Sequence, residues 1–268
     1  MIAVALLIAT QAAPVFAPPL DRPLVMTTET VRTEGTTTRR FIAHRTVRFS
    51  AAADGYRVAV TLDAAAPGED DSDPAGLLRA GFARLAGRTV VLQLDRAGSV
   101  VSIDDLPATW RAVIDGMGAL APTGTDPETR QRAARVRAIV ATLAVQPEAT
   151  QRRMIGSLVT PLIAPELVAE AATPAPPRAV RVPATSIYGK AELDGLRAVR
   201  ARPEGIEISV SATGPVAVGT ASATITLETL RRVDPATGLV VESREQVETL
   251  APDGSLHSER LTVTRLTR

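Results

Sequence analysis

The chain has 268 residues, 45% of them hydrophobic, and its 30 basic residues nearly balance 29 acidic ones, for a net charge of +1. This length and hydrophobic content predict a folded chain with a sizeable core. Balanced charge and an aromatic content of 3% leave no surface suited to nucleic acid. The absence of cysteine excludes disulfides, thiolate metal sites and cysteine nucleophiles.

The first 17 residues resemble a secretory signal peptide. An apolar run from Ile2 to Ala9 is followed by small residues, with candidate cleavage positions at Ala12 and Ala17. No Lys or Arg precedes the run, and the alternative is a buried N-terminal strand of a cytoplasmic protein. Neither this run nor any other segment approaches the ~20 apolar residues that a transmembrane helix requires. We therefore expect residues 1–17 to be a signal peptide and the protein to be periplasmic or secreted.

Residues 24–103 have the pattern of a β-rich region with one helix. Apolar and polar residues alternate through residues 24–63, which predicts strands with one buried face. Asp73 followed by Pro74 is typical of the start of a helix. A hairpin is expected over residues 89–103.

Residues 104–171 predict a helical insert, because apolar residues recur there at helical spacing. Residues 172–185, "ATPAPPRAVRVPAT", predict a Pro-rich extended linker, and residues 186–268 return to strand patterns punctuated by glycine turns. This β–α–β order favours an α+β fold: a curved antiparallel β-sheet, half-barrel-like, packed on the helical segment. Residues 18–268 would form a single domain.

Catalytic and metal-binding motifs are not recognisable in the chain. His44 and His257 lie on separate predicted segments, and the acidic run at residues 69–73 lacks the ligand order of an EF-hand loop. Ser186 and Lys190 would lie about 13 Å apart on an extended segment, too far for a catalytic dyad. Lys190 is the only lysine, so arginine clusters carry less information than usual. We expect no catalytic residue, no metal and no cofactor, and hence a non-enzymatic protein.

Glu245 is the charged residue whose predicted position raises a question. If the turn at residues 234–238 pairs Val233 with Leu239, Glu245 faces Leu227 on an otherwise apolar row and lies near Leu261 of the next strand. A carboxylate on the concave side of the sheet is costly unless it is solvated, forms an ion pair or contacts a ligand. Alternatively, a bulge at Gly238 shifts the register and turns Glu245 outward.

A family resemblance rests on three features: the β–α–β order, the signal segment and the hairpin D-P-x-T-G-L. The hairpin consists here of Asp234, Pro235, Thr237, Gly238 and Leu239. In these features the chain is similar to bacterial periplasmic proteins of the lipoprotein-carrier-like class. The resemblance implies an incomplete barrel, a curved antiparallel sheet that wraps around helices and can enclose an apolar cavity. It is architectural, and no functional residue of the family is carried over.

Two functions are consistent with these features. In the favoured one the interior is filled, and the protein acts by surface contact with an envelope protein, as an interaction or structural component. In the other it is a carrier for a lipid-like or other apolar ligand. The carrier hypothesis predicts that the ligand is lined by Trp110, Met117, Met154, Ile206, Ile208, Val210, Leu227, Glu245 and Leu261. An enclosed apolar space with a mouth would support the carrier, and a filled core would count against it.

Overall fold

The computed structural model of the protein describes residues 16–63, 74–171, 175–186, 189–218 and 221–268. Nearly all of the predicted signal segment, and the acidic run before Pro74, lie outside these residues.

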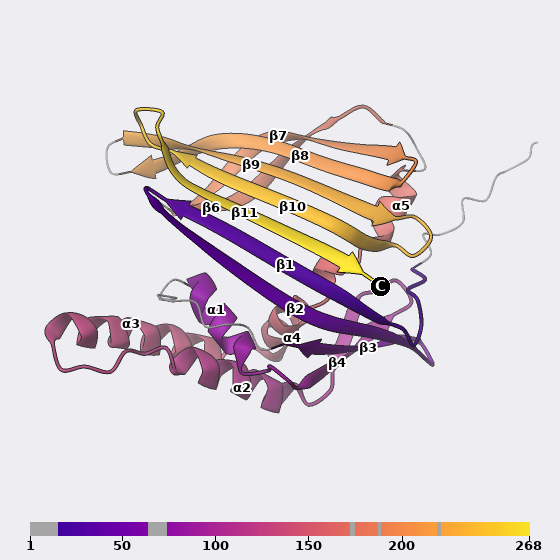
Figure 1. The fold of residues 1–268 in the computed structure, drawn as a ribbon, viewed down its shortest axis with the longest axis horizontal. Helices are drawn as coiled ribbons and strands as arrows, with labels where there is room; N and C mark the ends of the chain where they lie inside the picture. The colour runs from indigo at the N-terminus through magenta and orange to yellow at the C-terminus, as the bar shows by residue number, and fades with distance from the viewer. Residues whose placement is uncertain (1–15, 64–73, 172–174, 187–188, 219–220) are drawn as a thin grey trace, which may run out of the picture.

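The described residues hold eleven strands in one antiparallel sheet of the order β5-β4-β3-β2-β1-β11-β10-β9-β8-β7-β6 (Figure 1). The first five are β1 (Pro23–Glu34), β2 (Thr37–Ala52), β3 (Gly55–Leu62), β4 (Thr89–Asp95) and β5 (Val100–Ile103). The others are β6 (Arg178–Ser186), β7 (Gly189–Arg202), β8 (Gly205–Val218), β9 (Ala221–Asp234), β10 (Leu239–Leu250) and β11 (Leu256–Thr267). The first and last strands pair with each other, so the two ends of the chain meet in the middle of the sheet.

The helices lie in two connections between strands, one between the neighbouring strands β3 and β4 and one between β5 and β6. Helix α1 (Pro74–Ala83) follows β3. The connection from β5 to β6 contains α2 (Leu106–Gly118), α3 (Pro127–Ala144), α4 (Glu148–Gly156), the short 3-10 helix η1 (Thr160–Leu162) and α5 (Pro165–Ala171). Because β5 and β6 are the two edges of the sheet, this connection runs from one edge to the other. The sheet is curved and does not close, and the predicted α+β class is confirmed in its broad form, with more strand than helix.

One face of the sheet, here called the inner face, packs on the helices. Leu24, Val47, Val60 and Val90 are neighbours across β1 to β4 on this face, and all are buried. They form one core with apolar residues of α1, α2 and α4. Alternation along each strand turns the remaining side chains to the opposite, outer face.

The second half of the sheet curls strongly on itself. Strands two apart in a flat sheet lie almost 10 Å from each other, yet β7 and even β6 approach β9 to within 8 Å between Cα atoms. Leu193 and Ile225 are completely buried inside this curl. Ala212 and Ala223 line the same cluster, and their small side chains allow the strands to come close.

The predicted linker is where the structure departs most from the sequence pattern. Residues 178–185 belong to β6, which pairs with β7 along its length. Pro183 is accommodated because an edge strand has a free side, on which the missing N–H is not needed.

Candidate functional site

The residues predicted to line a ligand cavity belong to separate apolar clusters. Trp110 (4% exposed) and Met117 (1% exposed) are buried in the core beneath α2, where Met154 also packs. Ile206 and Ile208 contact the cluster formed with α5, whereas Val210 and Leu227 belong to the curl of β6–β10. The structure brings these residues together within each cluster and does not group them around one shared space.

Glu245 lies on the inner face, in a register that differs from the predicted one. Leu239 pairs with Asp234, and a shift between Val240 and Glu242 then places Glu245 opposite Thr229. The predicted pairing of Glu245 with Leu227 is therefore wrong. A bulge exists, but it lies at Val241, not at Gly238.

The bulge does not turn Glu245 outward. Val247, two residues further along β10, is buried in the curl, so Glu245 shares its face. The predicted turn at residues 234–238 is confirmed. There the Asp234 carboxylate accepts a hydrogen bond from the Ala236 N–H at 2.9 Å, and Gly238 has a φ of 72°.

Leu261 lies on the outer face, away from Glu245. It is opposite Gln246 of β10 and Val31 of β1, whereas Thr262 is opposite Glu245. The ion-pair partner of Glu245 is Arg260, whose Nη2 donates to Oε1 at 3.1 Å. Both side chains are 42% exposed, so this carboxylate is paired and partly solvated.

The middle of the inner face is hydrophilic. Between β1 and β11, the hydroxyl groups of Thr28 and Thr264 hydrogen-bond at 3.2 Å, and those of Thr30 and Thr262 at 3.3 Å. These threonines lie on the same face as Glu245 and its partner arginine. An apolar ligand on this part of the sheet would therefore meet hydroxyl groups and charges.

Arg45 is an unusual cation on the inner face of β2. Its Nη1 contacts the Met26 sulfur at 3.7 Å, and its buried Nε has no hydrogen-bond partner in the part of the chain that the structure describes. Burial lowers the pKa of Arg45, because desolvation disfavours the charged guanidinium. An anionic group would be favourable beside it.

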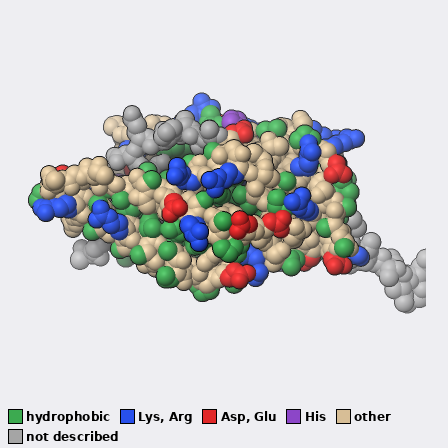
Figure 2. All heavy atoms as spheres, turned by 90° about the horizontal axis from the view of Figure 1, so that it is seen from below, with side chains coloured by type: hydrophobic (Ala, Val, Ile, Leu, Met, Phe, Trp, Pro, Cys, Tyr) green, Lys and Arg blue, Asp and Glu red, His purple; other side chains and the backbone are tan. Residues whose placement is uncertain are grey.

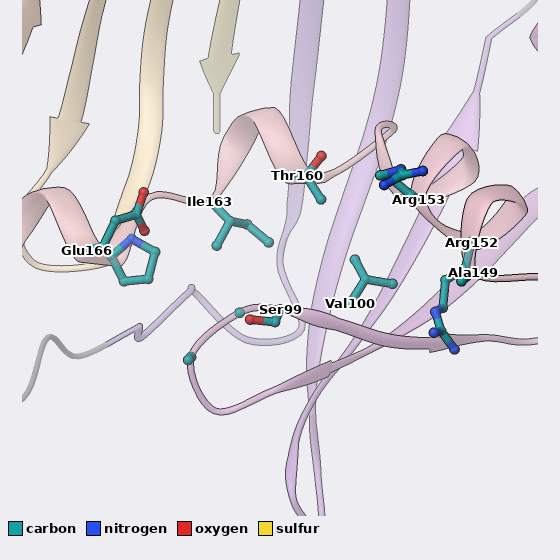
Figure 3. A pocket seen from close by; sticks show the side chains of 12 residues that line it. Ser99, Val100, Ala149, Arg152, Arg153, Thr160, Ile163 and Glu166 are labelled. Atoms are coloured by element: carbon teal, nitrogen blue, oxygen red, sulfur yellow. The ribbon is translucent and has the colours of Figure 1, made fainter. Parts of the chain in front are cut away.

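A cavity of about 410 Å³ lies next to the β5 edge of the sheet (Figure 3). It is formed by the turn between β4 and β5, by α4 and by the segment that leads into α5. We call it the α4 groove, and its lining is Ala97, Gly98, Ser99, Val100, Ala149, Arg152, Arg153, Gly156, Thr160, Ile163, Pro165 and Glu166.

Local backbone geometry gives the α4 groove its shape. The Asp95 carboxylate accepts hydrogen bonds from the N–H groups of Ala97 and Ser99, at 2.9 and 2.8 Å, and so holds the turn. Gly98 has a φ of +85°, and a Cβ there would lie 2.5 Å from Cγ2 of Ile163. Any larger residue would therefore clash with the floor of the groove as well as strain the turn.

The charges of the α4 groove are separated. Arg152 and Arg153 extend from α4 near one end, and Glu166 lies at the other (Figure 3). Arg153 donates to the Thr150 hydroxyl at 3.4 Å. Among the described residues, neither arginine forms an ion pair. As consecutive residues of a helix the two side chains point in different directions (Figure 3), and each guanidinium group can bind a carboxylate or another oxyanion.

Of the other polar residues that the sequence singled out, the acidic run at residues 69–73 and the side chain of Ser186 lie outside the described part of the chain. His44 contacts the Thr27 hydroxyl at 3.1 Å on an exposed surface. In the described ranges, no group of three or more His, Asp or Glu side chains could hold a metal ion, and no helix is long and apolar enough to cross a membrane.

Comparison with known proteins adds no assignment: no family model matches the chain, and no curated protein matches it. The resemblance to carrier-like folds therefore rests on the curved, unclosed antiparallel sheet.

Proposed function

We propose that the protein acts without catalysis, by surface contact, as an interaction or structural component of a bacterial envelope, and that the α4 groove is its binding site. The supporting observation is the packing of the inner face. Trp110, Phe49, Leu193 and Ile225 are at most 4% exposed, because helices cover the first half of the sheet and the curl fills the second. A carrier would need such residues to face an open chamber.

The lining of the α4 groove suggests an acidic peptide segment as its ligand. Arg152 and Arg153 would each bind a carboxylate, and the apolar side chains of Val100 and Ile163 would contact a short aliphatic group. Glu166 would accept a hydrogen bond from an N–H group of the same segment. A groove with both charges and an apolar floor favours an extended chain over a lipid tail.

Fluorescence anisotropy with a labelled pentapeptide, Gly-Asp-Val-Asp-Gly, tests this proposal. We expect binding that weakens at least about tenfold in the double variant Arg152→Gln and Arg153→Gln, because two charge-assisted hydrogen-bonding groups are lost. Arg200→Gln with Arg231→Gln removes the same charge elsewhere and should leave the affinity unchanged. Equal weakening by both double variants, or no binding by the wild type, would overturn the assignment of the groove.

The carrier function remains a second candidate because of Arg45. A largely buried guanidinium on the inner face could receive the anionic headgroup of an amphiphile. Displacement of a fluorescent fatty acid and native mass spectrometry of the purified protein separate the two functions. Surface contact predicts no bound lipid and no displaceable probe. Binding of the fatty acid that is lost in Arg45→Leu would instead support the carrier.

A further inference from the structure

Helix α3 projects from one end of the molecule (Figure 1). Its main contact is with α2, through a seam in which Ala133 and Val136 are buried and Val140 and Leu143 are half-buried. The remaining surface of the helix faces solvent. A helix held along a single seam presents most of its circumference to any partner outside the molecule.

The solvent side of α3 carries a small apolar strip between two flanks of arginine. Exposed residues recur at helical spacing to form the strip, which consists of Ala134, Ala138, Ala141 and the C-cap residue Val145. At 100° per residue, Arg130 and Arg137 lie on one flank of the strip and Arg135 lies on the other, whereas Arg132 lies about 150° from the strip, close to the seam with α2. Val145 is 80% exposed, which is unusual for a β-branched apolar side chain.

Within the described residues, the arginines of α3 lack ion-pair partners. Figure 2 shows basic side chains at the projecting end. The acidic residues of this helix are at its start: Glu128 in the first turn and Asp126 at the N-cap, with Asp126 attracting Arg132. The rest of α3 therefore keeps its positive charge available.

We infer that α3 docks the protein on an anionic lipid bilayer. Arginine side chains on both flanks can reach phosphate groups while the strip enters the interface between headgroups and acyl chains. The strip is small, so attraction between arginine and anionic lipid dominates and should be screened by salt. The position of α3 at an extremity lets a flat surface approach it without contact with the sheet (Figure 1). This inference is independent of the α4 groove.

Vesicle co-sedimentation of the full chain tests the charge requirement. At low salt we expect binding to phosphatidylcholine vesicles that contain about 30% phosphatidylglycerol, and none to pure phosphatidylcholine. Replacing Arg130, Arg132, Arg135 and Arg137 with glutamine should weaken binding at least about a hundredfold, since each arginine near the bilayer surface contributes roughly fivefold. The matched control replaces four exposed arginines elsewhere: Arg48, Arg88, Arg200 and Arg231. The inference would be overturned if the wild type and the α3 variant bound the vesicles equally well. It would also be overturned if the control variant lost as much binding as the α3 variant.

A second measurement keeps the four arginines and therefore does not depend on whether the quadruple arginine variant folds. Because the chain contains no cysteine, Val145→Cys provides a unique site for an environment-sensitive fluorophore. We expect its emission to shift to the blue on the anionic vesicles, and a label at Leu256→Cys, 51% exposed in the wild type, to remain unchanged. The protein could instead bind soluble poly-glutamate as tightly as vesicles, with no shift in the emission of the label at position 145. That result would overturn the inference and assign α3 to an acidic polymer.

Discussion

Arg197 on β7 and Glu170 on α5 form a two-pronged ion pair that fastens the last helix to the inner face. Nη2 of Arg197 donates to Oε2 of Glu170 at 2.6 Å, and Nη1 donates to Oε1. Arg178 on β6 lies 3.5 Å from the same carboxylate. The hydrogen bond from Arg197 lowers the pKa of Glu170 below its ordinary value and raises the pKa of Arg197.

Acid should therefore weaken the attachment of α5. A carboxyl whose folded pKa is lowered stabilises the fold above its unfolded pKa, near 4.5, and loses this contribution as pH falls through the folded value. We expect Glu170→Gln to lower the free energy of unfolding by about 1 kcal/mol at pH 7 and by much less at pH 3. Urea denaturation at both pH values measures this, with the exposed Glu204→Gln as control. The same loss at both pH values would contradict the ionic attachment.

Two glycines set the distance between α1 and α2. A Cβ on Gly81 would lie 2.9 Å from the carbonyl oxygen of Val113, and one on Gly116 would lie 2.6 Å from that of Ala80. Backbone atoms cannot move aside as a flexible side chain can. We expect Gly116→Ala to destabilise the protein by about 1–3 kcal/mol, despite the better helix propensity of alanine.

Gly118 is the matched control for this substitution, because it lies in the same helix and a Cβ there would meet nothing within 4 Å. Gly118→Ala should leave the free energy of unfolding unchanged or raise it by up to about 1 kcal/mol. Thermal unfolding of the two variants gives the comparison. Similar effects at the two positions would show that the helices do not cross at Gly116.

The local elements of this fold are predictable from the sequence, whereas their long-range pairing is not. Alternating residues in β2 and β3 and the Asp126-Pro127 helix start have local physical causes, which the structure shows directly. The pairing of β1 with β11 joins residues such as Val25 and Thr267, which nothing local brings together. Pro183 illustrates the same limit, because only the edge position of β6 makes a proline compatible with a strand.

The register of Glu245 and the α4 groove were missed for related reasons. The bulge at Val241 has no local signal comparable to Gly238, so the sequence suggested the wrong position. The groove combines three separate stretches, and its adjacent Arg152 and Arg153 do not stand out in a chain where arginine is so common. Apolar residues such as Trp110 were recognised correctly as inward-facing, but periodicity does not distinguish packing from the lining of a cavity.

The N-cap of α3 should control how well this projecting helix forms. Oδ1 of Asp126 accepts a hydrogen bond from the Thr129 N–H at 2.8 Å, and hydrogen bonding with Thr129 lowers the pKa of Asp126. Since a single seam supports α3, we expect Asp126→Ala to reduce the helical signal in circular dichroism, and Asp126→Asn to retain most of it.

The same cap should respond to pH. The Asp126 carboxylate stabilises α3 above its unfolded pKa of about 3.8 and loses this effect as pH falls through the lowered folded value. The asparagine variant, which accepts the hydrogen bond at every pH, should show a smaller decrease in helicity on acidification. An identical decrease in both proteins would exclude Asp126 as the titrating cap.

Glu245 and Arg260 provide a test of whether the polar middle of the inner face is solvated. Both side chains are 42% exposed, and the Nη2 to Oε1 distance of 3.1 Å brings them into contact across β10 and β11. An ion pair this exposed is screened by water, so a double-mutant cycle with Glu245→Gln and Arg260→Gln should give a coupling energy below about 1 kcal/mol. Urea denaturation of the four proteins measures it. A coupling energy of about 3 kcal/mol or more would instead require a desolvated ion pair. The inner face would then be covered along its whole width, by a segment or a ligand that lies over Glu245.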